Sequence, residues 1–84
     1  MTFEWDYRKN RKNKKRHKIS FEEVIPVFDD PYTITDVYDK KHSKNEHRYL
    51  AFGYLINRHS KVMISYTYRG DDVVRIISAR KIKN

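Results

Sequence analysis

The sequence has 84 residues, no cysteine, and a net charge of +8 from 19 Lys and Arg against 11 Asp and Glu. A domain of this length has a small core, and without cysteine no disulfide or thiolate metal site can stabilise it further. The cationic excess favours a polyanionic partner: nucleic acid, an anionic membrane surface or an acidic protein. No apolar run is long enough to cross a membrane and the N-terminus does not resemble a signal peptide, so we expect one cytoplasmic domain spanning residues 1–84.

The N-terminal segment predicts a short strand and a very basic helix. Residues alternate over Thr2–Asp6, which is typical of a strand, and Asp6 can cap a helix running from Tyr7 to about Arg16. Its many Lys and Arg side chains repel one another, so this helix needs tertiary contacts or a bound anion. The alternative is a frayed basic arm.

A second helix is predicted to begin at Ser20. Ser20 and Glu23 have the spacing of a capping box, and the apolar residues of the next two turns fall on one helical face. Pro26 lies inside this pattern and should kink or shorten the helix, because it removes a backbone hydrogen bond. Pro31 then ends it.

The second half of the chain predicts four antiparallel strands. The strand-forming runs are Tyr32–Tyr38, Arg48–Ile56, Val62–Tyr68 and Val73–Ala79. Gly53 is a candidate β-bulge. We therefore predict an α+β domain in which two N-terminal helices pack on a four-stranded antiparallel sheet, with room for a short extra N-terminal strand.

The last two strands are expected to form a hairpin around Gly70 and Asp71. Glycine at the first position of a two-residue loop favours a type II′ turn. The cross-strand pairs of this register are Arg69–Asp72, Tyr66–Arg75, Ile64–Ile77, Val62–Ala79 and Lys61–Arg80. The last pair places two cations side by side, which is unfavourable unless an anion lies nearby.

Short motifs along nearly the whole chain occur in the order found in one known family. They are Phe3-Glu4-Trp5-Asp6, Lys9, Asn13, Arg16-His17, Ser20-Phe21-Glu22-Glu23, Val27-Phe28-Asp29-Asp30-Pro31, His42-Ser43, Glu46, Arg48, Phe52-Gly53, Arg69-Gly70-Asp71 and Arg75-Ile76-Ile77-Ser78-Ala79-Arg80-Lys81. In these motifs the sequence resembles the BrnT-type toxins of bacterial type II toxin–antitoxin systems. It departs from them at Lys14, where an apolar residue is usual, and at Lys18, where glycine is usual. It also ends soon after Lys81, where family members commonly continue into a helix.

The resemblance implies a RelE-like fold and a ribonuclease that inhibits translation without a cofactor. It also implies a small antitoxin with a ribbon-helix-helix DNA-binding part. Operator DNA would then be bound only through the toxin–antitoxin complex, which represses its own operon. Because the segment Arg8–Lys18 is so cationic, we expect an acidic surface of the antitoxin to contact Lys9, Arg11 and Lys12.

Metal-free RNA cleavage requires a base for the 2′-hydroxyl, cations for the phosphate and an acid for the leaving oxygen. The candidate catalytic residues are Arg80 from the resemblance, Arg75 with Tyr66 from the predicted register, and His17 as acid or base. The alternatives are that Arg80 pairs with a carboxylate, that Arg75 and Tyr66 form a cation–π pair, and that His17 caps its helix. Further residues expected to contact RNA are Lys9, Arg16, Arg48, Arg69 and Lys81.

Other functions fit parts of the sequence. A metal site is not expected, because His42 and His47 lack the close carboxylates or cysteines that would complete one. Composition alone would favour a basic nucleic-acid-binding module without catalysis. A third possibility is an interaction partner whose positive face meets an acidic protein.

Overall fold

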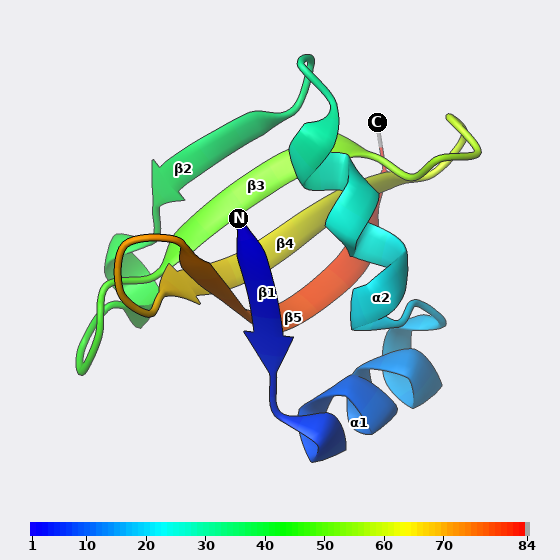
Figure 1. Ribbon diagram of the computed structural model, residues 1–84. Helices are drawn as coiled ribbons and strands as arrows, with labels where there is room; N and C mark the ends of the chain where they lie inside the picture. Colours follow the sequence, from blue (N-terminus) through cyan, green and yellow to red (C-terminus); the bar gives the residue numbers. More distant parts are fainter. Residues whose placement is uncertain (84) are drawn as a thin grey trace.

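The computed structural model describes residues 1–83 and consists of a five-stranded sheet with helices on one face (Figure 1). In chain order the elements are β1 Thr2–Trp5, α1 Tyr7–His17, α2 Phe21–Val24, the 3₁₀ helix η1 Ile25–Asp29, β2 Ile34–Tyr38, the 3₁₀ helix η2 Lys40–His42, β3 Tyr49–Tyr54, β4 Lys61–Tyr68 and β5 Val73–Ile82. The strand order is β1-β5-β4-β3-β2, with β1 parallel to β5 and the other neighbours antiparallel. The predicted α+β class is confirmed. The predicted four-stranded antiparallel sheet is incomplete, because β1 adds a fifth, parallel strand beside β5 and makes the sheet mixed.

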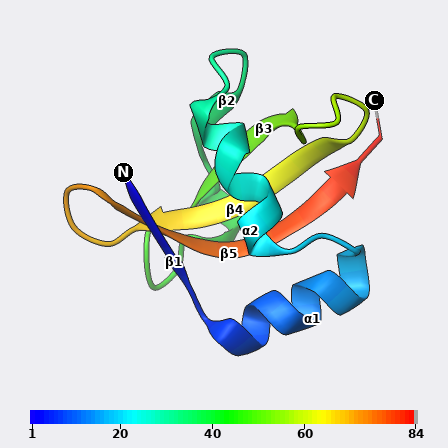
Figure 2. The same cartoon turned by 45° about the vertical axis from the view of Figure 1, so that its right-hand side comes forward.

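The short helix α2 and η1 cover the centre of the sheet. Figure 2 shows α2 crossing over β4 and β5, with α1 alongside β5. The capping box is present, because the Glu23 backbone N–H donates to Ser20 Oγ at 3.2 Å and Glu23 Oε1 accepts from the Ser20 backbone N–H at 3.1 Å. The α-helix ends at Val24 and Pro26 lies in the 3₁₀ turn that follows, as its missing N–H requires. Phe21 and Val24 are fully buried against the sheet.

The basic helix α1 is held by two buried asparagines in place of an apolar face. Asn13 Nδ2 donates to the carbonyl oxygens of Ala79 (2.8 Å) and Ile19 (3.0 Å), and Asn13 Oδ1 accepts from the Ala79 N–H (3.1 Å). Asn10 Oδ1 accepts from the Phe21 N–H, and its Nδ2 donates to Glu22 Oε1, both at 2.8 Å. These bonds supply the tertiary contacts that the helix was predicted to need, so the frayed-arm alternative is wrong.

Both ends of α1 have the caps that their backbone requires. Asp6 accepts from the backbone N–H groups of Arg8 and Lys9, which confirms the predicted N-cap. These bonds lower the pKa of the Asp6 carboxyl. At the other end Lys18 adopts a left-handed φ of 62° and its N–H bonds the Lys14 carbonyl. Glycine adopts this conformation without steric cost. This explains why glycine is usual at this position in the family, where the present sequence has Lys18.

The β4–β5 hairpin forms, but its predicted turn and register are wrong. The Arg69 N–H bonds the Val73 carbonyl at 2.8 Å, which leaves residues 70–72 as a three-residue loop and shifts the register by one residue from the prediction. One residue of β5, Ile77, has no partner in β4, so the register shifts again between Ser65 and Tyr66. The observed pairs are Tyr68–Val74, Thr67–Arg75, Tyr66–Ile76, Ser65–Ser78, Ile64–Ala79, Met63–Arg80, Val62–Lys81 and Lys61–Ile82.

This register changes which side chains share a face. Tyr66 pairs with buried Ile76 on the face under the helices, whereas Arg75 pairs with Thr67 on the opposite face. We call that opposite side, away from α1 and α2, the open face. Arg80 pairs with Met63 there, so the predicted Lys61–Arg80 cation pair does not form.

Gly53 is not a bulge. It pairs with Val62 in the unbroken ladder between β3 and β4. A Cβ atom at this position would lie 2.6 Å from Thr33 Oγ1 and 2.7 Å from Val27 Cγ1, because η1 and the turn after it pass directly over the strand. Glycine is therefore required by close packing.

Candidate active site

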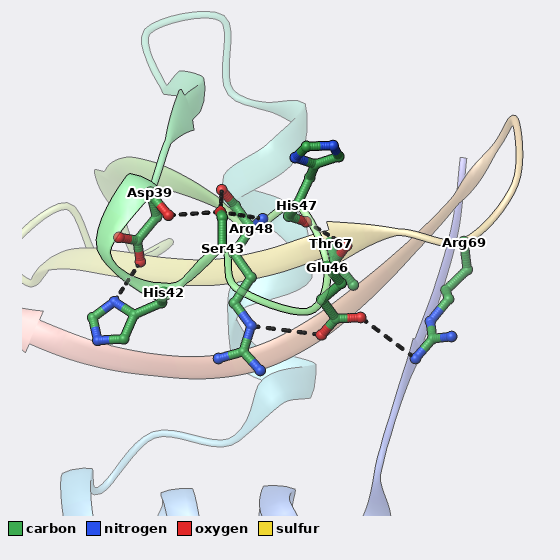
Figure 3. A network of polar contacts seen from close by, with 8 residues as sticks. All are labelled: Asp39, His42, Ser43, Glu46, His47, Arg48, Thr67 and Arg69. Carbon is green, nitrogen blue, oxygen red and sulfur yellow. Dashed lines mark hydrogen bonds and ion pairs between the residues drawn. The ribbon is translucent and has the colours of Figure 1, made fainter.

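The loop between β2 and β3 is fixed by hydrogen bonds within itself and to β4 (Figure 3). Ser43 Oγ donates to the Asp39 carbonyl at 2.6 Å and accepts from the Arg48 N–H at 2.9 Å. The Asp39 N–H bonds the Arg48 carbonyl, which closes the base of the loop. From β4, Thr67 Oγ1 donates to the His47 carbonyl at 2.6 Å. The side chains between residues 42 and 48 therefore stand on a defined backbone.

Glu46 lies between two arginines. Its Oε2 is 3.5 Å from Arg48 Nε and its Oε1 is 3.8 Å from Arg69 Nη2. Arg48 Nε is buried and makes no hydrogen bond within residues 1–83, so this ion pair is loose. We call Glu46, Arg48 and Arg69 the Glu46 cluster. The predicted Arg69–Asp72 pair is wrong, since Asp72 instead contacts the N-terminal amino group of Met1 at 3.2 Å.

A histidine of the same loop is oriented by a carboxylate. His42 Nδ1 lies 2.8 Å from Asp39 Oδ2, and the His42 side chain is 57% exposed, whereas that of Asp39 is 13% exposed. The carboxylate accepts the Nδ1 proton, which leaves Nε2 as the ring nitrogen that can exchange a proton with another molecule. In Figure 3 the His42 and Arg48 side chains extend to the same side of the network.

The Glu46 cluster opens onto a hollow of about 390 Å³ at the ends of β3 and β4. Its lining residues are Glu46, His47, Tyr49, Thr67, Tyr68 and Arg69. Arg75 lies opposite Thr67 in the sheet and bonds Glu4 Oε2 at 2.7 Å. The lining of the hollow therefore combines the Glu46 carboxylate and the Arg69 guanidinium group with the rings of Tyr49 and Tyr68.

Behind these rings, two tyrosine hydroxyls meet at Asp36. Tyr66 is fully buried; its hydroxyl donates to Asp36 Oδ1 at 2.7 Å and accepts from the Asp36 N–H at 2.6 Å. The Tyr68 hydroxyl donates to the same Oδ1. Burial, with the Asp36 carboxylate, raises the pKa of Tyr66 and raises that of Tyr68 to about 12. Both phenols are therefore neutral donors.

The structure separates the catalytic residues expected from the sequence. Arg75 lies near the hollow, but Tyr66 is on the other face of the sheet, so they form no joint site. Arg80 is on the open face four residues further along the ladder, about 13 Å away. His17 ends α1, whose Asn13 contacts Ala79 at that distant end of β5.

The remaining residues expected to contact RNA fall into two groups. Arg48 and Arg69 meet in the Glu46 cluster, whereas Lys9 and Arg16 lie on α1 and Lys81 on β5. Sequence reasoning did not select Glu46 or His42 for catalysis. The sequence did contain a signal for these two residues, because both belong to the motifs in which the chain resembles the BrnT-type toxins.

Two kinds of structural feature are absent from residues 1–83. No three His, Asp or Glu side chains are grouped so that they could hold a metal ion. No helix in this part of the chain has the length and apolar character needed to cross a membrane.

Comparison with known proteins identifies the family. No curated protein sequence matches the chain. A crystal structure of the Brucella abortus ribonuclease toxin BrnT matches with a TM-score of 0.76 at 20% identity, covering 100% of this chain and 99% of that one, which shows a shared fold. A family profile described as "Ribonuclease toxin, BrnT, of type II toxin-antitoxin system" matches residues 5–84. The resemblance predicted from the motifs is thus confirmed, and the protein belongs to the BrnT family of ribonuclease toxins of type II toxin–antitoxin systems.

Proposed function

We propose that this protein is a metal-independent endoribonuclease that cuts RNA at the Glu46 cluster and thereby inhibits translation. The observation that carries the proposal is the position of Glu46, between Arg48 and Arg69 and on the wall of the hollow. A carboxylate base beside two guanidinium groups has the parts that metal-free transesterification of RNA requires.

In the proposed reaction Glu46 takes the proton of the 2′-hydroxyl. The 2′-oxygen then attacks the adjacent phosphorus, the bond to the 5′-oxygen breaks, and a 2′,3′-cyclic phosphate forms. Arg48 and Arg69 stabilise the extra negative charge on the phosphate, as preorganised cations do. Protonated His42, held by Asp39, gives its Nε2 proton to the departing 5′-oxygen. No metal ion or cofactor enters this scheme.

The two ion pairs of Glu46 suit this role. They place the carboxylate directly beside the two guanidinium groups that would hold the phosphate. Both contacts are long, at 3.5 and 3.8 Å, so a phosphate can replace the carboxylate on either arginine. Arg75, which pairs with Thr67 of the hollow and is bonded to Glu4, would contact a neighbouring phosphate of the RNA. Arg80 and Lys81 would contact a more distant part of the RNA.

We further propose that a small antitoxin with a ribbon-helix-helix part neutralises the toxin, and that the complex binds operator DNA. A type II family implies an antitoxin partner. The exposed cations of α1 provide a surface to which an acidic segment would be steered. The antitoxin should raise the melting temperature, because it binds only the folded toxin, and it should block RNA cleavage.

The test is RNA cleavage by wild type and by Glu46→Gln, each with and without EDTA. Wild type should cut RNA in EDTA. Glu46→Gln should lower kcat by about 10²- to 10⁴-fold, the usual contribution of a general base, with little change in RNA affinity. Glu22→Gln is the matched control, because it removes one carboxylate charge far from the hollow and can still accept from Asn10.

Three other results would change the assignment. Loss of cutting in EDTA with recovery on adding magnesium would refute the metal-free mechanism. Full activity of Glu46→Gln would show that another group is the base. RNA binding without any cleavage by wild type would favour the non-catalytic nucleic-acid-binding module.

A further inference from the structure

The hollow beside the Glu46 cluster has an aromatic wall that the proposed reaction does not use. Tyr68 is 41% exposed there, and its ring packs against Tyr49 (centroids 5.5 Å apart) and against buried Tyr66 (5.8 Å), both edge to face. His47, which also lines the hollow, bonds the Tyr38 hydroxyl at 3.1 Å through Nδ1. Aromatic rings and the Arg69 guanidinium group thus share one small concave surface.

The orientation of Tyr68 is fixed. Its hydroxyl donates to Asp36, whose φ of 59° is unusual for a residue with a side chain. Asp36 keeps this conformation because Tyr66 binds both its N–H and its Oδ1. A ring held in this way loses little conformational entropy when another ring stacks on it, so Tyr68 is preorganised for binding.

The ring itself is the part of Tyr68 that remains for a ligand. Its hydroxyl is already bonded to Asp36, and its pKa of about 12 keeps it neutral. A flat, uncharged aromatic surface next to arginines suits a nucleobase whose own phosphate lies among those arginines. Every base has such a π-face, so stacking of this kind tolerates different sequences.

We propose that the hollow binds one nucleobase of single-stranded RNA, stacked on Tyr68, while the adjoining phosphate lies at the Glu46 cluster. The identity of the ligand rests on the proposed ribonuclease function. The hollow then does more than hold catalytic groups, because base stacking on Tyr68 fixes which phosphate reaches Glu46. Asp36 is a positioning residue that acts through Tyr68.

The test measures binding without cleavage. A short single-stranded 2′-deoxy oligonucleotide lacks the attacking hydroxyl, and an abasic oligonucleotide of equal length has the same phosphates without bases. Wild type should bind the base-containing probe more tightly by about 5- to 150-fold, the range found for stacking of one base. Tyr68→Leu should lose most of this preference while its affinity for the abasic probe is unchanged. Tyr68→Phe keeps the ring but loses the bond to Asp36, so it should keep only part of the preference.

Tyr32→Leu is the matched control, because Tyr32 is 86% exposed and lies outside the hollow. Thermal unfolding of each variant shows whether it is folded. NMR of wild type gives a second readout that needs no variant: the Tyr68 ring signals should shift with the base-containing probe and not with the abasic one. Full base preference in folded Tyr68→Leu, or an unshifted Tyr68 ring in wild type, overturns the proposal.

The two proposals fail separately. A wild type that binds bases through Tyr68 but does not cut RNA would disprove the catalytic proposal and leave the base site standing. A wild type that cuts RNA through Glu46 but binds both probes equally would disprove the base site alone.

Discussion

At the scale of one residue, the conformation and contacts of Asp36 could not be predicted from the sequence. The sequence places it inside the predicted strand Tyr32–Tyr38 and gives it no special role. In the structure the register of β2 shifts between Ile34 and Val37, and Asp36 takes a left-handed conformation that aspartate tolerates better than most residues. The cause is tertiary, since the hydroxyls of Tyr66 and Tyr68 reach it from a strand thirty residues later. Local pattern holds no information about such contacts.

The Asp36–tyrosine contacts predict a loss of stability in alkali. The pKa of Tyr68 in the folded protein is about 12, above its usual value of 10.0, so the unfolded chain loses this proton first. The stabilisation is therefore complete below about pH 10 and disappears as the pH rises towards about 12. Urea unfolding across this range should show a falling free energy of unfolding. The fall should be shallower in Tyr68→Phe and unchanged in Tyr32→Phe; equal slopes in all three proteins would contradict the prediction.

At the scale of an element, α1 shows how a helix can be fixed without an apolar face. Helices are usually predicted from the spacing of their apolar residues. That spacing gives no signal for α1, because its buried residues are Asn10 and Asn13. The N-cap at Asp6 predicted where the helix begins, but not what holds it. Asparagine can donate and accept at once, which lets Asn13 pair with both backbone groups of Ala79 on β5.

Asn13→Ala should therefore be strongly destabilising. The change removes three hydrogen bonds and leaves buried backbone groups of Ala79 and Ile19 without partners, at a cost of about 2–3 kcal/mol. Urea denaturation measures the effect, and faster hydrogen exchange of the Ala79 amide would locate it. Exposed Lys14→Ala in the same helix is the control, with an expected effect within about 0.5 kcal/mol. A similarly small effect of Asn13→Ala would mean that α1 is held by other contacts.

The β4–β5 hairpin shows that strands can be predicted from the sequence when their register cannot. Both strands and their pairing were predicted from β-rich runs and a turn glycine, and both are confirmed. The loop has three residues where two were predicted, and Ile77 is unpaired; each of these shifts the register by one residue. A shift of one residue moves a side chain to the other face, so Arg75 could not be placed from the sequence. Arg48 and Arg69 were selected individually, but only the folded loop brings them to Glu46.

At the scale of the whole molecule, the positive charge is unevenly compensated. Glu46, Glu4 and Asp30 pair with arginines of the sheet and its loops. By contrast, four cations on one face of α1 make no ion pair within residues 1–83: Arg8, Arg11, Lys12 and Lys15. These four line a single hollow and lie opposite the anchoring asparagines. Family membership, fold class and excess charge were all predicted from the sequence, whereas this distribution of charge required the fold.

The uncompensated charge of α1 gives the last prediction, which concerns the antitoxin. Lys9, Arg11 and Lys12 are exposed on this helix, so reversing all three to glutamate should leave the core intact and relieve repulsion within the helix. If an acidic antitoxin segment contacts α1, association should become about tenfold slower or more at low salt, because long-range steering is lost. Stopped-flow binding at several salt concentrations measures this, with Lys40, Lys41 and Lys44 reversed together as the charge-matched control. Unchanged association of a folded α1 variant would place the antitoxin elsewhere. Slower association of the control alone would place it over the loop that carries Glu46, where it would block cleavage directly.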